Sequence, residues 1–219
     1  MTPMNLALET GLDLNLRANL VTGFNLAPTR HLAILRHPSD QTCVDQAFWS
    51  YTPTGLKNLA QAPYVLRAES LEDNPFCCKT WAQTTCLIPV TGFYLWQQGA
   101  KKKTPFAVRR PDNRPFFLAG LWTTYRISSN QTQLSFALIN RCAESWLQPI
   151  HSRTPVILST ESIRYWLDPD APHITKKQIL QQPDPVLEVF PVGSRVNDPD
   201  INESSLTQPL TAQKFRRGT

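Results

Sequence analysis

The stretch TTCLIPVTGFYLW, which runs from Thr84 to Trp96, decides how the rest of the sequence is interpreted. Its first half, Cys86–Val90, has the apolar composition of a buried strand, and its second half ends on four large side chains, Phe93–Trp96. Gly92 between them can adopt backbone angles closed to other residues, so we expect a kink there, with the aromatic side chains beyond it lining a cleft. A cleft that performs chemistry needs an acid or a base, and at that position the chain has Leu95.

The composition is that of a folded protein with a mild basic surplus. The chain has 219 residues, enough for one large domain or two small ones, of which 41% are apolar and 18% charged. Its formal net charge is +5 and its pI about 9.1. This charge permits a phosphate-bearing partner without requiring one.

The cysteines, the histidines and the N-terminus narrow the class of protein further. The five cysteines are odd in number and include the adjacent Cys77 and Cys78, which indicates a reducing cytosol rather than a disulfide framework. No stretch approaches the roughly 18 apolar residues of a membrane span, and the N-terminus lacks the features of a signal peptide. No cysteines have zinc-finger spacing, and the histidines are scattered. We expect a cytoplasmic protein without membrane association, metal or cofactor.

Short apolar runs bounded by prolines and other turn formers predict strands on both sides of the opening stretch. The run FFLAGLW, 116–122, is apolar at both parities, so this strand should be covered on both faces. The predicted strands are His31–Arg36, Ala47–Tyr51, Tyr64–Glu69, Cys86–Val90, Pro105–Arg110, Phe116–Ile127 and Gln133–Asn140.

Helical patterns are fewer and shorter. Ser159 or Thr160 can cap the segment SIRYWL, and residues 175–180 form another short candidate. Residues 73–83 are predicted to be a helix with a proline in its first turn. The sequence therefore predicts one α+β domain over 1–210, dominated by strands with a few peripheral helices, and a basic C-terminal tail at 211–219.

The common catalytic motifs are missing, and short clusters remain. There is no glycine-rich phosphate loop, GxSxG, HExxH or CxxC. In TGFNLAPTR, Asn25 most simply ties down a turn through its side-chain amide. In YVLRAES, Arg67 and Glu69 share one strand face, which favours a local ion pair. In PIHSRTPVIL, His151 is more simply structural than catalytic, but Arg153 nearby makes an anion site conceivable because guanidinium binds phosphate through two hydrogen bonds.

Taken together and in this order, these clusters resemble the SOS response-associated peptidase (SRAP) family, whose members sense abasic sites and bind single-stranded DNA. FNLAPT is similar to the family's YN-APT segment, AFWSYTP to WGL-P, and YVLRAES to NAR-ET. TTCLIPVTGFYLW resembles RRCLIPADGFYEW, and IHSRTPVIL resembles IH-RMPVIL. The resemblance covers roughly Leu6 to Leu210 and implies a barrel-like arrangement of antiparallel and mixed sheets.

The resemblance also implies a chemistry, of which this chain keeps a part. Family members begin Met-Cys-Gly-Arg-Phe, and the exposed cysteine forms a thiazolidine with the sugar aldehyde of an abasic site. A glutamate and a histidine move protons, and an asparagine orients the sugar. Here Thr2 offers no thiol, and Val65 and Leu95 occupy the family asparagine and glutamate positions. His151 is the remaining member of the catalytic set.

The residues at the positions that the resemblance assigns to the DNA groove match the family better than those at the catalytic positions. Arg67 and Trp96 match the family's groove, and Arg153 and Arg195 are further candidates for phosphate contacts. Lys101–Lys103 reads more simply as a solvated turn. The leading hypothesis is a catalytically degenerate member that binds single-stranded or damaged DNA without crosslinking. Two alternatives stay open: an active abasic-site enzyme whose N-terminal cysteine is missing from this chain, and an interaction protein on the same scaffold that does not bind DNA and whose protein partner is unknown.

Overall fold

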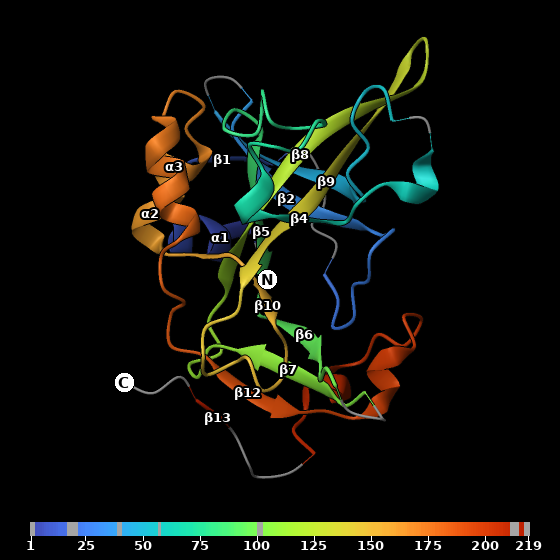
Figure 1. Ribbon diagram of the computed structural model, residues 1–219, viewed down its shortest axis with the longest axis vertical. Coiled ribbons are helices and arrows are strands. Elements are labelled where there is room, and N and C mark those ends of the chain that lie inside the picture. The colour runs from blue at the N-terminus through green and yellow to red at the C-terminus, as the bar shows by residue number, and fades with distance from the viewer. Residues whose placement is uncertain are drawn as a thin grey trace.

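The computed structural model describes residues 3–16, 22–38, 41–56, 58–99, 103–210 and 215–216, and five of its strands close into a barrel (Figure 1). Each pairs antiparallel with the next in the order β3, β2, β5, β8, β9, and a parallel pairing of β9 with β3 closes the ring. The five strands are β2 (His31–Arg36), β3 (Thr42–Trp49), β5 (Thr85–Val90), β8 (Phe116–Ser128) and β9 (Gln131–Cys142).

Four short strands extend the barrel at its edges. β1 (Leu14–Leu16) lies parallel on β3, and β4 (Val65–Arg67) lies parallel on β9. β10 (Arg153–Pro155) pairs antiparallel with β9, and β11 (Ile157–Leu158) pairs antiparallel with β8. The end of β9 is therefore flanked by two segments that are far apart in the sequence.

A second, four-stranded antiparallel sheet lies below the barrel in Figure 1. Its strand order is β13, β12, β7, β6. The bounds are β6 (Gly92–Trp96), β7 (Pro105–Arg109), β12 (Glu188–Pro191) and β13 (Phe215–Arg216).

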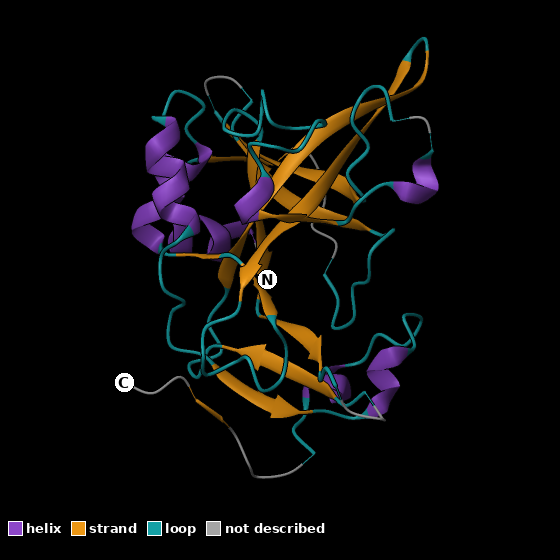
Figure 2. Cartoon of the chain, viewed as in Figure 1, coloured by secondary structure: helices purple, strands orange, loops and turns teal. Residues whose placement is uncertain are grey.

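In the part of the chain that the structure describes, three α-helices gather on one side of the barrel, and the other helical segments are short 3-10 turns (Figure 2). The α-helices are α1 (Pro3–Thr10), α2 (Thr160–Leu167) and α3 (His173–Leu180), and the 3-10 turns are η1 (Leu59–Gln61), η2 (Ala68–Ser70), η3 (Ser194–Asn197) and η4 (Ser204–Thr207). Within the described ranges, no helix is long and apolar enough to span a membrane.

The apolar core consists of two large clusters and a small one. The helix-side cluster joins the barrel to α2 and α3, with Trp166 fully buried. The sheet-side cluster joins the barrel to the four-stranded sheet and contains Ile34, Phe136 and Leu95. The C-terminal cluster is built around Phe190 and packs against Trp96. The four-stranded sheet is thus held between two apolar clusters.

Most of the predicted elements are confirmed. The side chain of Ser159 accepts a hydrogen bond from the backbone N–H of Ser162 and caps α2, as expected. Residues Phe116–Leu121 of β8 are all buried, which agrees with a strand covered on both faces. β3 begins earlier than predicted, at Thr42, and β4 ends at Arg67 instead of continuing to Glu69.

Two predictions are wrong. Residues 73–83 form a chain of hydrogen-bonded turns rather than a helix. The side chain of Asn74 accepts a hydrogen bond from the N–H of Phe76, and asparagine, cysteine and threonine have low helix propensity. The second is the expected reason for a kink at Gly92: its φ is not positive, so the residue does not use backbone angles closed to other residues. A Cβ there would lie 2.8 Å from the carbonyl oxygen of Val108, so close strand approach requires the glycine.

Some sequence predictions fall outside the described residues. These include Thr2, Lys101 and Lys102. Of the predicted tail at 211–219, only Phe215–Arg216 is described, as β13 paired with β12.

Candidate functional site

One face at the end of β9 gathers several of the sequence-predicted residues. In the register, Val65 lies opposite Leu138 and Arg67 opposite Asn140. On the other edge, Arg153 lies opposite Cys142. Because alternate residues of a strand share a face, five of these side chains lie on one face. They are Val65, Arg67, Asn140, Cys142 and Arg153.

Arg153 is bound within this face by several hydrogen bonds. Its Nη2 donates to Oε2 of Glu69 over 2.6 Å and to the carbonyl oxygen of Asn140 over 3.1 Å. Its Nε donates to Oδ1 of Asn140 over 3.0 Å, and Nη1 lies 3.7 Å from the exposed Cys142 sulfur. The Arg153 side chain is 19% exposed. Its charge is therefore already neutralised inside the protein.

Glu69 is the acid that neutralises Arg153, which corrects the predicted pair with Arg67. β4 ends at Arg67 and Glu69 lies in the η2 turn, so strand alternation no longer relates the two residues. Partial burial raises the pKa of Glu69, but it is outweighed by hydrogen bonds from Arg153 and from the N–H groups of Glu69 itself and Cys142, together with the Arg153 charge. The net effect lowers the pKa to about 2.

Arg67 remains exposed at the end of β4. In the described part of the chain, no carboxylate forms an ion pair with its guanidinium. The neighbouring Tyr64 is 52% exposed, and its carbonyl oxygen accepts a hydrogen bond from the Trp49 indole N–H over 2.8 Å. β4 therefore carries an exposed cation at its last residue and is preceded, three residues earlier, by an exposed aromatic ring.

Leu95 and Val65 are part of an apolar environment. Leu95 is 8% exposed within the sheet-side cluster, and Val65 packs against the same cluster. Ile150, which precedes His151, belongs to it as well. The two positions that lack polar groups in the sequence are thus packed apolar positions in the structure.

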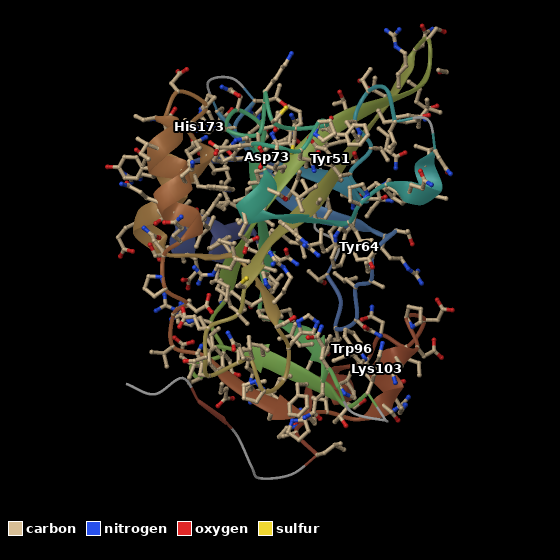
Figure 3. The ribbon with its side chains drawn as sticks, viewed as in Figure 1. Tyr51, Tyr64, Asp73, Trp96, Lys103 and His173 are labelled. Carbon is tan, nitrogen blue, oxygen red and sulfur yellow. The ribbon has the colours of Figure 1, made fainter. Side chains whose placement is uncertain are left out.

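Trp96 lies on the opposite face of β6 from Leu95. Its ring packs against the C-terminal cluster, and its Nε1 donates to Oδ1 of Asn197 over 2.7 Å. In Figure 3, Trp96 lies beside Lys103 at the end of the four-stranded sheet, whereas Tyr64 lies on the barrel side. The ring is partly exposed, with its edge fixed by the Asn197 amide.

Arg195 belongs to the C-terminal loop region next to Trp96, and Asn25 contacts this region from the segment before β2. Arg195 forms a surface ion pair of 3.1 Å with Glu203. The Asn25 side-chain nitrogen lies 2.9–3.2 Å from three carbonyl oxygens of a distant loop. These belong to Val196, Asp198 and Ile201. Asn25 therefore ties two segments together, rather than only its own turn.

His151 is held between Gln98 and the first residue of β10, Arg153. Its Nε2 lies 3.1 Å from Nε2 of Gln98, and its Nδ1 lies 2.8 Å from the carbonyl oxygen of Arg153. Oε1 of Gln98 accepts a hydrogen bond from the N–H of Ser152 over 3.0 Å. Both ring nitrogens of the half-buried imidazole thus contact hydrogen-bonding groups of the protein.

The chain is similar to known proteins both in sequence and in fold. A model of the family described as SOS response associated peptidase (SRAP) matches residues 2–199. The chain belongs to the SRAP family.

Relatives of this SRAP protein are similar over most of its length. Abasic site processing protein YoqW of Bacillus subtilis (strain 168) is 26% identical over 190 residues, which cover 84% of this chain and 85% of YoqW. Abasic site processing protein YedK of Escherichia coli (strain K12) is 26% identical over 145 residues, which cover 66% of this chain and 64% of YedK.

Solved structures share the SRAP fold. A crystal structure of a Bordetella bronchiseptica protein matches with a TM-score of 0.73 at 22% identity, covering 88% of this chain and 96% of that one. A Bacteroides thetaiotaomicron protein matches with a TM-score of 0.72 at 18% identity, covering 84% of this chain and 82% of that one. At these identities the likeness shows the fold.

The SRAP motifs are brought together only in part. Arg67, Arg153 and Val65 share the face at the end of β9, whereas Trp96 and Arg195 lie at the C-terminal cluster. Sequence reasoning missed Gln98 and Asn140, which contact His151 and Arg153. Neither residue stands out by type or spacing, and only the fold brings them to their partners.

Proposed function

We propose that this SRAP protein binds single-stranded or damaged DNA without forming a thiazolidine crosslink. The names of YoqW and YedK, abasic site processing proteins, support damaged DNA as the class of ligand. One contrast carries the proposal: Arg67 presents a free cation, whereas Leu95 and Val65 are packed in an apolar cluster. A group that can hold phosphate is kept, and two positions that would take part in chemistry are apolar.

Arg67 supports the binding half of the proposal. An exposed guanidinium without an internal counter-ion can bind a phosphate through two hydrogen bonds. Arg153 and Arg195 are each paired with a glutamate, so a phosphate would have to displace Glu69 or Glu203 to reach them. The net charge of +5 adds a general attraction for a polyanion.

Trp96 and Tyr64 supply aromatic surface for bases. Stacking of a base on an aromatic side chain is worth about 1–3 kcal/mol and tolerates any sequence. The hydrogen bond from Trp96 to Asn197 fixes the orientation of its partly exposed ring. Tyr64 is three residues from Arg67 and is 52% exposed. Each ring can therefore hold one base without contributing sequence preference.

The apolar packing of Leu95 in the sheet-side cluster supports the second half of the proposal, that no crosslink forms. Imine formation and ring closure need proton transfers, which the family assigns to a carboxylate and an imidazole. Leu95 can donate or accept no proton, and its 8% exposure leaves little room for water to replace the missing carboxylate. His151 is the one group of that set that this chain keeps, and its Nε2 is in contact with Gln98.

Fluorescence anisotropy with labelled single-stranded DNA, with and without an abasic site, tests the binding half. Arg67→Ala should weaken binding about tenfold at low salt and reduce the slope of log K against log salt by about 0.7, the value for one phosphate contact on a single strand. Arg164→Ala is the matched control. Arg164 is exposed on α2, and its substitution removes the same charge.

Two outcomes contradict the proposal. Equal effects of the Arg67 and Arg164 substitutions would assign the binding to net charge alone. Undetectable binding at low salt would remove DNA as the ligand and favour an interaction protein on the SRAP scaffold.

A further inference from the structure

Gln98 makes three contacts with the segment that carries His151. Its backbone N–H donates to the carbonyl oxygen of Ile150 over 2.9 Å. Its side-chain Oε1 accepts from the N–H of Ser152 over 3.0 Å, and its Nε2 lies 3.1 Å from Nε2 of His151. The amide therefore bridges two consecutive residues of the segment.

The orientation of the Gln98 amide follows from its contact with Ser152. A backbone N–H can only donate, so the amide atom facing it must be the oxygen. The amide nitrogen then faces His151 and can only donate, so Nε2 of the imidazole must accept with its lone pair. In a neutral imidazole the proton then lies on Nδ1, which donates to the carbonyl oxygen of Arg153 over 2.8 Å.

The surroundings of Nδ1 can serve the other tautomer as well. The backbone N–H of Arg153 lies 3.0 Å from Nδ1 and would donate to it if the ring proton were on Nε2. Nδ1 thus faces both a backbone acceptor and a backbone donor of Arg153, and the Arg153 N–H is left without this acceptor when Nδ1 carries the proton. The Gln98 amide at Nε2 favours the proton on Nδ1. Gln98 is the group that faces Nε2.

We propose that Gln98 is a positioning residue that fixes His151 as the Nδ1-protonated tautomer and occupies the Nε2 lone pair. In this state the imidazole offers neither a proton nor a free lone pair at Nε2 to a bound molecule. A base or acid role for His151 at Nε2 therefore requires the Gln98 amide to move first. The inference concerns the free protein and does not depend on DNA binding.

Long-range ¹H–¹⁵N spectra of the ¹⁵N-labelled protein at about pH 8, where a free imidazole is largely neutral, test the proposal. His151→Gln assigns the signals by their loss. In the wild type, Nδ1 should resonate as a protonated nitrogen and Nε2 as an unprotonated one. The reverse pattern would overturn the proposal.

Gln98→Glu provides the sharper variant. A carboxylate still accepts the Ser152 N–H but can only accept from the ring, so Nε2 should shift to the protonated range. Gln97→Glu adds the same charge at the neighbouring position and should leave the ring nitrogens unchanged. Circular dichroism and thermal unfolding check that both variants fold. A His151 spectrum unchanged by Gln98→Glu in a folded variant would contradict the proposal.

Discussion

Arg153 and Glu69 lie 84 positions apart in the sequence and form an ion pair with 2.6 Å between Nη2 and Oε2. The pair connects β10 to the η2 turn across the end of β9. It places an internal carboxylate on an arginine that the sequence makes a candidate for a phosphate contact. Under the proposed function, Glu69 would compete with DNA for Arg153, whereas Arg67 has no carboxylate partner among the described residues.

Glu69→Gln should strengthen DNA binding at low salt. The substitution removes the negative charge from Arg153 while keeping an oxygen that can accept its hydrogen bond. We expect about a fivefold gain in affinity, the equivalent of ~1 kcal/mol for a half-exposed ion pair. Anisotropy titrations measure it, with Glu72→Gln as the control because Glu72 pairs with Lys177 on the helix side. Equal gains in the two variants would contradict a specific role for Glu69.

The stability of the protein in acid should depend on Glu69. Its pKa in the folded protein is about 2, below the value of about 4.3 for an unfolded glutamate. The unfolded state binds more protons between these values, so the stabilisation is complete above about pH 4.5 and is lost as the pH falls towards 2. Urea unfolding at about pH 6 and pH 3 should show a larger loss for the wild type than for Glu69→Gln. Parallel losses would show that the ion pair contributes nothing to stability.

Leu95→Glu tests whether the position opposite Phe106 in the sheet register accepts a carboxylate. Burying an unpaired charge in the sheet-side cluster should cost about 3 kcal/mol or more at pH 8, and less at pH 5 as the carboxyl becomes protonated. Leu95→Met should lower the free energy of unfolding by less than about 1.5 kcal/mol. Leu95→Gln should also lower it, by an amount that does not change with pH. Guanidinium unfolding measures all three. A Leu95→Glu variant as stable as the wild type at pH 8 would show that the position is not closed to charge.

Lys176 is fully buried, and its ammonium donates to the carbonyl oxygen of Ala82 and to Oγ1 of Thr85. Burial lowers its pKa to about 8, against the opposing charges of Asp168 and Asp170. Because the folded pKa lies below the unfolded value of about 10.4, the unfolded state binds more protons between them. The Lys176 contribution to stability should therefore rise as the pH increases through this window.

Lys176→Met makes this pH dependence measurable. Between about pH 7.5 and pH 10, the wild type should gain about 2–3 kcal/mol relative to the variant in chemical unfolding experiments. Lys177→Met, which removes an exposed lysine from the same helix, should show no such trend. If the difference in unfolding free energy between the wild type and Lys176→Met did not change with pH, the pKa of Lys176 would not be lowered by folding.

The strands of the barrel could be predicted because each carries its own local pattern. The segment FFLAGLW alone predicts that β8 is covered on both faces, and its residues Phe116–Leu121 are buried. The cap of α2 at Ser159 was predicted for the same reason, since a cap is a local feature. β10 and β11, of three and two residues, are too short to carry a pattern and exist through their pairing with β9 and β8.

The candidate site was less predictable because its contacts are long-range. The sequence places Arg67 and Glu69 two residues apart, but the strand ends between them and Arg153 takes the carboxylate. Gln98 and Asn140 lie in segments that offer no motif, and they meet His151 and Arg153 only in the folded chain. Motif spacing selected the candidate residues, whereas the contacts between them could be found only in the structure.

Incubation with single-stranded DNA that contains one abasic site, followed by a heated denaturing gel, tests the central claim most directly. We expect DNA to be bound before denaturation, with an affinity that falls steeply as salt rises, and to migrate as free DNA on the gel. A heat-stable protein–DNA adduct would contradict the account, since it would show that this chain makes a covalent bond without a carboxylate at position 95.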